Sequence, residues 1–122
     1  MTAWDPYVSD CPSRRLLDRI GDRWTVLVVG ALSDGPRRFS EIARRVDGIS
    51  QKMLTQTLRG LEQDGLVTRT VTAAVPVRVD YELTDSGRSL QGPLRALEEW
   101  AIEHMSPVLA ARERFVTSTS SS

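Results

Sequence analysis

The residues best suited to chemistry lie on one face of a helix predicted between Ser50, a good N-cap, and about Asp64. Leucines at 54, 58 and 61 recur at the spacing of a core-facing stripe. Hydrogen-bond donors occupy the helix start and the opposite face: Ser50, Gln51, Lys52, Thr55, Gln56, Arg59 and Gln63. Arginine and lysine suit guanine O6 and N7, glutamine suits adenine N6 and N7, and threonine reaches a thymine methyl. We therefore expect this face to read bases in the major groove of duplex DNA.

Two alternatives compete for this face. It could be an ordinary solvated surface, but such surfaces usually mix in acids, which here are delayed until Glu62 and Asp64. It could instead meet a protein, and such an interaction module should tolerate acids on the same face. The sequence therefore predicts a DNA-binding regulator, with a winged-helix protein–protein module as the alternative.

Positive charge is concentrated in the middle of the chain, although the 122 residues have a formal net charge of 0. Residues 36–79 hold eight basic and four acidic residues, whereas residues 80–122 hold four basic and seven acidic ones. This asymmetry is typical of a segment that faces a polyanion, although chance clustering on a solvated face would give the same pattern. The residues expected to contact phosphates are Arg37, Arg38, Arg44, Arg45, Arg69 and Arg78.

Helical periodicity predicts a helix-turn-helix that includes this face. Helices are expected at Pro12–Ile20 and at about residues 24–32, the second apolar nearly all round and therefore buried. Another is expected at about residues 39–46, and Asp47-Gly48 supplies a tight turn to the helix that begins after Ser50.

The spacing of apolar residues then changes to the alternation of strands. Strands are expected at residues 66–71 and 77–83, joined by a link at 72–76 that carries no basic residue. The absence of charge there argues against insertion of the tip into a minor groove. The fold class is therefore α+β and mainly α: a winged helix-turn-helix with a two-stranded β-hairpin wing and terminal dimerisation helices.

A last helical region, capped by Thr84, carries an apolar stripe that a chain of this length has too little surface to cover. We therefore expect a homodimer, with help from the first helix, and a kink or restart at Pro93. The expected interface residues are Leu16, Leu90, Leu94, Leu97, Trp100, Ala101 and Met105. Residues 1–10 are expected to form a flexible arm, residues 11–116 a single domain, and residues 117–122 a disordered tail.

Cys11 is the single cysteine, which excludes an internal disulfide and is compatible with a reducing cytoplasm. It stands at the N-cap of the first helix, and Arg14 and Arg15 follow within one turn. The helix dipole and both charges would lower the pKa of its thiol. Cys11 is therefore a candidate redox or electrophile sensor, and the alternative is a small cap residue with no signalling role.

No residue pattern indicates an enzyme, a metal site or a cofactor. The lone histidine, His104, lies beside Glu103 on an amphipathic helix, and no catalytic or phosphate-loop motif is present. The first ten residues lack the features of a signal peptide, and no apolar run approaches the roughly 20 residues of a membrane span. Trp4, Tyr7 and Trp100 could line a pocket for a small-molecule effector between two subunits.

An ordered set of residues resembles the HxlR-type winged-helix regulators, relatives in shape of the multiple-antibiotic-resistance repressors. The matching residues run from 11 to 100: Cys11-Pro12, 21–24, 38–42, 48–50, Leu54, Leu58, Leu61-Glu62, 65–67, Arg69, Pro76, 79–81, Leu83-Thr84, Gly87, Pro93, Leu97 and Trp100. Asp80 departs from the glutamate expected there.

The resemblance implies a DNA-binding homodimer that activates or represses nearby genes. A two-fold dimer would bind an inverted-repeat operator. In several members of the family the cysteine before the first helix senses oxidants or electrophiles, which puts Cys11 forward, whereas other members answer to small molecules.

Overall fold

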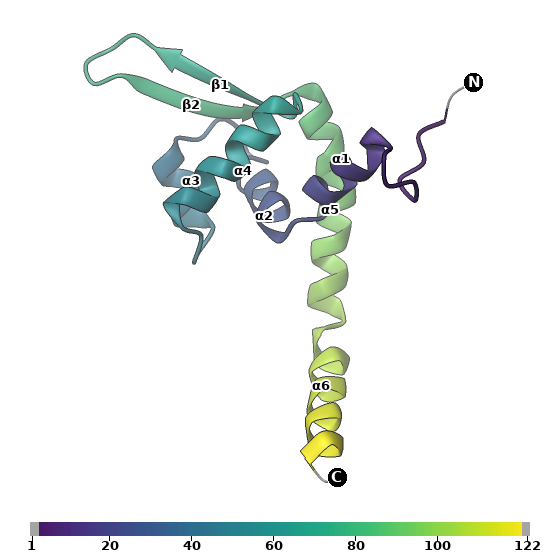
Figure 1. The fold of residues 1–122 in the computed structure, drawn as a ribbon. Helices are drawn as coiled ribbons and strands as arrows, with labels where there is room; N and C mark the ends of the chain where they lie inside the picture. Colours follow the sequence, from purple (N-terminus) through teal and green to yellow (C-terminus); the bar gives the residue numbers. More distant parts are fainter. Residues whose placement is uncertain (1–2, 121–122) are drawn as a thin grey trace. The chain divides into compact units, whose positions relative to one another are not determined.

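The computed structural model describes residues 3–120, which form six helices and a two-stranded antiparallel sheet (Figure 1). The elements are α1 (Pro12–Ile20), α2 (Arg23–Ala31), α3 (Phe39–Arg45), α4 (Gln51–Gln63), β1 (Val67–Thr72), β2 (Arg78–Leu83), α5 (Asp85–Glu103) and α6 (Met105–Ser120). Two compact units divide the chain after Gln91. This division lies within α5 and within the residues 11–116 that were expected to form a single domain.

The first unit has its core between α2, α3, α4 and the base of the hairpin. Its fully buried side chains include Val28, Ile42, Leu54, Leu58 and Leu61. The leucine stripe expected on α4 therefore faces the core, as the helical spacing predicts. α2 is less buried than expected, because Leu27 is 40% exposed. α1 contributes no buried residue at all.

Side-chain caps begin α2 and α4, and a glycine turn ends α4; the cap at Ser50 is the one that the sequence predicts. Ser50 Oγ accepts from the Met53 N–H at 3.0 Å, and Asp22 Oδ1 accepts from the Trp24 N–H at 2.8 Å. Gly65 has a φ of +72°, and the Leu66 N–H donates to the Leu61 carbonyl at 2.9 Å. Together with the 3.1 Å bond from the Gly65 N–H to the Glu62 carbonyl, this is the Schellman motif that ends α4.

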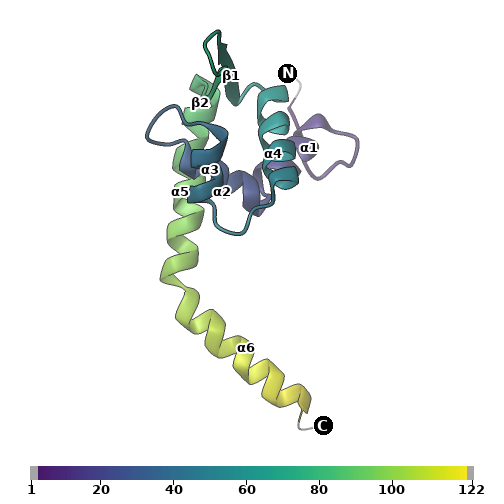
Figure 2. The same ribbon diagram turned by 90° about the vertical axis from the view of Figure 1, so that its left-hand side faces the viewer.

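The hairpin pairs β1 with β2 in a register that runs from Val67 opposite Leu83 to Thr72 opposite Arg78. Arg37 extends this ladder, because its N–H donates to the Tyr81 carbonyl at 2.9 Å and its carbonyl accepts from the Tyr81 N–H at 2.8 Å. This backbone link between the α2–α3 connection and the wing has no counterpart in the sequence prediction. Figure 2 shows α3 and α4 joined by their short connection, with the hairpin following α4.

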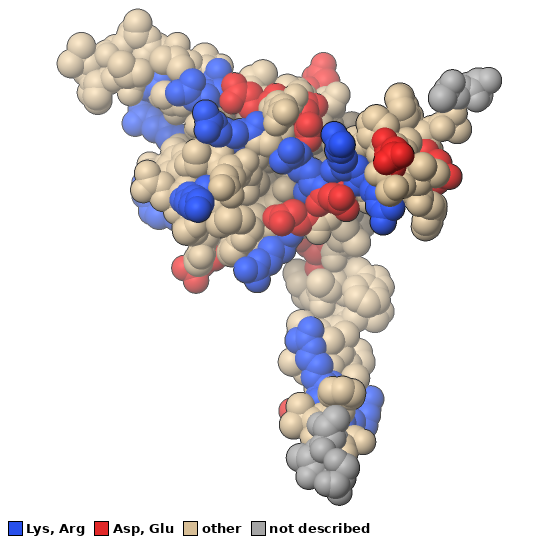
Figure 3. Space-filling model, in the orientation of Figure 1, with Lys and Arg blue, Asp and Glu red and all other residues tan. Residues whose placement is uncertain are grey.

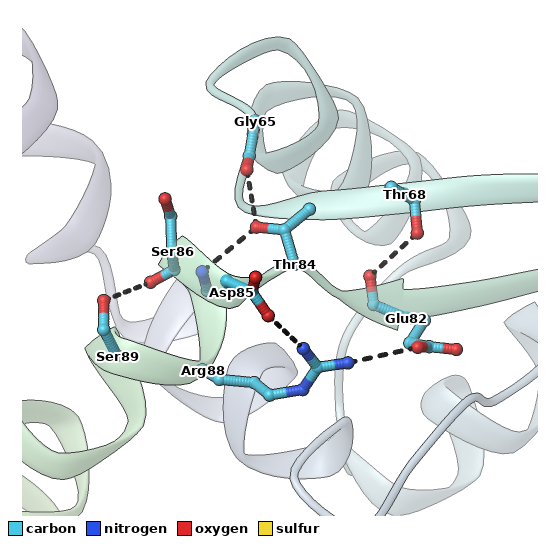
Figure 4. A network of polar contacts seen from close by, with 9 residues as sticks. Gly65, Thr68, Glu82, Thr84, Asp85, Ser86, Arg88 and Ser89 are labelled. Carbon is cyan, nitrogen blue, oxygen red and sulfur yellow. Dashed lines mark hydrogen bonds and ion pairs between the residues drawn. The ribbon is translucent and has the colours of Figure 1, made fainter.

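A polar network holds the base of the hairpin to the start of α5 (Figure 4). Thr84 Oγ1 donates to the Gly65 carbonyl at 2.6 Å and accepts from the Gly87 N–H at 3.1 Å, which is the capping role expected of Thr84. Arg88 joins Asp85 at 2.8 Å and Glu82 at 3.2 Å. The network therefore fixes the first turn of α5 to the turn that ends α4.

The second unit contains the rest of α5 and α6. Pro93 lies inside α5, which continues to Glu103, so the helix does not restart at this proline. The break comes at His104, where Pro107 cannot donate an N–H to the carbonyl of Glu103. Residues 117–120, expected to be disordered, end α6, and Thr117 Oγ1 donates to the Glu113 carbonyl at 3.0 Å. The last two residues of the expected tail lie outside the described part of the chain.

Candidate nucleic-acid interface

The two faces of α4 are segregated as expected. Its buried face carries Leu54, Thr57, Leu58, Gly60 and Leu61. Its exposed face carries Gln51, Lys52, Thr55, Gln56, Arg59 and Gln63. The N-terminal end of the helix has no acid in its first turn, so its unpaired N–H groups and its side chains both favour an anionic partner. Ser50 has a defined structural role, because its hydroxyl caps the helix.

Three of the expected phosphate contacts surround one hollow of about 390 Å³, which is lined by Arg38, Ser40, Glu41, Arg44 and Arg78. Glu41 Oε1 accepts from the Arg38 N–H at 2.9 Å, so its carboxylate serves to cap α3. Arginines from the start of α3, from its last turn and from β2 thus line one hollow. A backbone phosphate is the anion whose size and charge suit such a cluster.

Arg45 and Arg37 line a neighbouring hollow of about 440 Å³ together with Asp34 and Arg44. Arg45 is exposed, whereas Arg37 is partly covered and lies 4.0 Å from the Asp34 carboxylate. Arg37 therefore has two roles that the sequence did not indicate: its backbone holds the wing, and its side chain faces an acid. It is the weaker candidate for a phosphate.

The wing carries its charge on its two paired strands and none at its tip. Arg69 is exposed on β1, and Arg78 Nε lies 3.0 Å from Asp80 Oδ2. Residues 73–77 carry no charge, and Val75 is fully exposed. The projecting end of the wing is accordingly free of blue and red atoms in Figure 3. The charges of the wing therefore lie on its strands, and Arg78 is in the last strand pair before the uncharged tip.

Cys11 occupies the N-cap of α1, as expected, but its side chain makes no capping bond. Its Sγ accepts from the Asp5 N–H at 3.3 Å and lies 3.1 Å from Ser13 Oγ. The Ser13 hydroxyl, followed by the Ser13 backbone N–H, lowers the pKa of the thiol below its ordinary value. The direction of the pKa shift is the expected one, but its causes are these hydrogen bonds rather than Arg14 and Arg15.

The arm before Cys11 is folded into turns where a loose segment was expected. The Val8 N–H donates to the Asp5 carbonyl and the Cys11 N–H to the Val8 carbonyl, each at 3.1 Å. Tyr7 N–H also donates to Asp5 Oδ1 at 3.0 Å. These bonds bring Asp5 back to the sulfur. The first two residues of the expected arm lie outside the described part.

The expected dimer face is open in most places. Leu16 on α1 and Leu97 and Trp100 on α5 are each about half exposed or more, and Ala101 and Met105 are exposed. Leu90 is partly exposed. Leu94 was expected at the interface, but its side chain is only 4% exposed and is therefore already buried within the chain. Leu17, Ile102 and Leu109, which the sequence prediction did not name, are also exposed. The sequence signal that could have identified these residues is their spacing along the helices.

Other chemistries find little support in the described residues. No group of three His, Cys, Asp or Glu side chains in the described part could hold a metal ion. No helix among residues 3–120 is both long and apolar enough to cross a bilayer. His104 stacks on Trp100 with ring centroids 4.2 Å apart and has Nδ1 2.9 Å from the Trp100 carbonyl, a local contact within a helix.

A helix-turn-helix whose second helix exposes hydrogen-bond donors, followed by a hairpin wing, defines a DNA-binding protein of the winged-helix class. The chain belongs to the HxlR family of transcription regulators, because the family model described as HxlR-like helix-turn-helix matches residues 19–108. The resemblance and fold class predicted from the sequence are both confirmed.

Relatives and solved structures agree with this assignment. The HTH-type transcriptional regulator YtfH of Escherichia coli is 40% identical over 107 residues, which cover 88% of this chain and 85% of that protein. The structure of ytfH from Salmonella typhimurium is similar with a TM-score of 0.85 at 40% identity, covering 91% of this chain and 99% of that one. The structure of diamide-treated YodB from B. subtilis has a TM-score of 0.66 at 39% identity, covering 79% and 96%.

Proposed function

We propose that the protein regulates transcription as a homodimer that binds an inverted-repeat operator, with α4 in the major groove. The observation that carries the proposal is the exposed face of α4, which presents donors and no acid over its first two turns. A protein-binding face would tolerate acids there, and this one has none before Glu62. In a two-fold dimer, two copies of α4 about 34 Å apart would meet successive major grooves.

We assign base reading and phosphate binding to different helices. Gln56 is exposed on α4 and suits adenine N6 and N7. Arg44 is exposed on α3 and lines the same hollow as Arg38 and Arg78. Base contacts confer sequence preference, whereas phosphate contacts orient the protein and make its affinity depend on salt.

The test compares Gln56→Ala with Arg44→Ala on an operator, found by footprinting or by selection from random duplexes, and on a random duplex. Gln56→Ala should weaken operator binding by about 1–3 kcal/mol and leave random binding nearly unchanged. Arg44→Ala should weaken both and reduce the salt slope by about 1. Equal weakening of both duplexes by Gln56→Ala would overturn the base-reading assignment. A wild type with no salt-dependent duplex binding would favour the protein–protein module.

A second candidate function is control through Cys11 in a reducing cytoplasm. It is favoured by the hydrogen bonds that Asp5 and Ser13 offer to Sγ, which lower the pKa of the thiol, and by the similarity to a regulator studied after diamide treatment. Two Cys11 thiols would pass two electrons and two protons to diamide and form one disulfide between subunits. Alternatively, one thiolate would add to the electrophilic carbon of a quinone.

This control is tested by DNA affinity before and after diamide or quinone treatment. The wild type should react much faster than free cysteine at pH 7 and change its affinity, and Cys11→Ser should not respond. A Cys11→Ser protein that still responds would remove Cys11 from the mechanism. A wild type insensitive to both reagents would favour the other predicted control, a small-molecule effector.

A further inference from the structure

Among the described residues, a single arginine near the end of α1 links this helix to the reading helix α4 by a polar contact. Arg19 forms an ion pair with the carboxylate of Asp64, the residue at the C-cap of α4. α1 has no buried residue, so the hydrophobic core does not fix it. A hollow of about 470 Å³ is lined by residues of α1, α2 and α4 that include Asp18, Arg19 and Gln56.

Arg19 lies directly on a glycine of α4. A Cβ at Gly60 would overlap Arg19 Nη1 and Cζ, so a side chain at this position would have to displace the flexible end of Arg19. The guanidinium therefore crosses α4 at the one position where no side chain stands. Glycine is a poor residue for a helix interior, and this close approach gives its presence in α4 a physical reason.

The contacts of Arg19 fall on the same row of α4 as a proposed base-reading residue. Gln56, Gly60 and Asp64 are spaced by four, so they follow one another along one side of the helix. Arg19 covers the second of these positions and pairs with the third. A shift of its guanidinium would therefore act on the row in which Gln56 stands.

We propose that Arg19 is a positioning residue for DNA reading, which fixes the orientation of α4 through Gly60 and Asp64. The proposal rests on the proposed function of α4. Since α1 adds nothing to the core, release of Arg19 leaves the leucines of α4 packed and removes only the contact that steadies the side of the helix on which Gln56 stands. Sequence preference should then fall more than stability or binding to random DNA.

The first experiment measures the ratio of operator to random-duplex affinity for Arg19→Ala, Gly60→Ala and the double variant. Each single change should lower the ratio about tenfold, the loss expected of roughly one base contact. The double variant should be no worse than either single one, because both changes remove the same contact. Arg14→Ala is the matched control, an exposed arginine of α1 whose removal should leave the ratio unchanged.

A second readout needs no DNA. In the Arg19→Ala background, Gly60→Ala should raise the melting temperature by a few degrees, because alanine is the better helix former. In the wild type the same substitution must displace the guanidinium and should raise it less or lower it. Equal shifts in the two backgrounds would show that Arg19 does not occupy the space above Gly60.

The outcomes separate this proposal from the one on which it rests. A wild type that does not prefer any operator sequence overturns the proposed function. A selective wild type with an equally selective Arg19→Ala variant overturns the positioning role alone. If circular dichroism shows that Arg19→Ala is unfolded, the ratio of operator to random-duplex affinity is measured for Asp64→Asn instead. This variant removes the ion pair with little change in shape.

Discussion

The leucines of α4 are buried, whereas leucines at the end of α5 and in α6 are exposed. Leu54, Leu58 and Leu61 are at most 2% exposed in the first unit, whereas Leu97 and Leu109 in the second are 57% and 49% exposed. Burying one such side chain stabilises by roughly 1.5–3 kcal/mol. The first unit therefore completes its core within one chain, and the apolar surface of the second indicates that it needs another surface to cover it.

The largest effect should come from placing a charge on the open surface. Leu97→Asp should yield a folded monomer and abolish tight DNA binding, because the second copy of α4 would be lost from the complex. Sedimentation and circular dichroism check the state of the protein, and operator binding checks the consequence. The matched change in the first unit, Leu54→Ala, should instead lower the free energy of unfolding by about 2–5 kcal/mol.

The comparison between the units fails if the wild type is itself a monomer in sedimentation at micromolar concentration. It also fails if Leu97→Asp destabilises the fold as much as Leu54→Ala does. In either case the exposed leucines would not mark a dimer surface.

A smaller effect is expected where α5 begins, within the first unit. A Cβ at Gly87 would lie 2.1 Å from the Leu66 carbonyl oxygen, a backbone atom that cannot move aside easily. Gly87→Ala should therefore lower the free energy of unfolding by about 1–3 kcal/mol in a urea titration. Ser86→Ala, one residue earlier and exposed, is the control and should change it by less than about 0.5 kcal/mol. If Gly87→Ala and Ser86→Ala change the free energy of unfolding equally, the polar network at Thr84 does not hold the start of α5 rigidly against Leu66.

Local rules predicted the first unit well. A capping serine before Gln51, a glycine after Asp64 and a change of apolar spacing were enough for α4 and the wing, because these signals involve neighbouring residues. Apolar spacing also found the stripe on α5, but it could not tell that Leu94 is buried while Leu97 is exposed. Burial depends on which surface covers each residue, and sequence spacing does not contain that information.

The features that the sequence did not predict involve residues far apart in the chain. The contact of Arg19 with Gly60 and the backbone pairing of Arg37 with Tyr81 join segments about forty residues apart. A glycine inside a helix indicates a close approach without naming the partner. At Pro93 the local rule allowed either a kink or a restart of the helix, and α5 continues through the proline without restarting.

The smallest effect concerns Cys11, on an arm that lies outside the packed core. Because the Ser13 hydroxyl is the largest cause of the lowered thiol pKa, Ser13→Ala should raise the pH at which Cys11 is half ionised. At pH 7 the variant would carry less thiolate and react more slowly with iodoacetamide. The slowing should be modest, about two- to fivefold, because a thiolate of higher pKa is also the stronger nucleophile.

The pH dependence separates a change in pKa from a change in access. Above about pH 10, where both thiols are ionised, Ser13→Ala should react at least as fast as the wild type, whereas a loss of access would slow the reaction at every pH. Arg14→Ala is the control that distinguishes hydrogen bonding from the nearby positive charge. If Arg14→Ala slows alkylation at pH 7 as much as Ser13→Ala does, the charge on α1 governs the thiol and the Ser13 contact does not. If only Ser13→Ala does so, the turn that brings Asp5 and Ser13 to the sulfur sets the reactivity of Cys11.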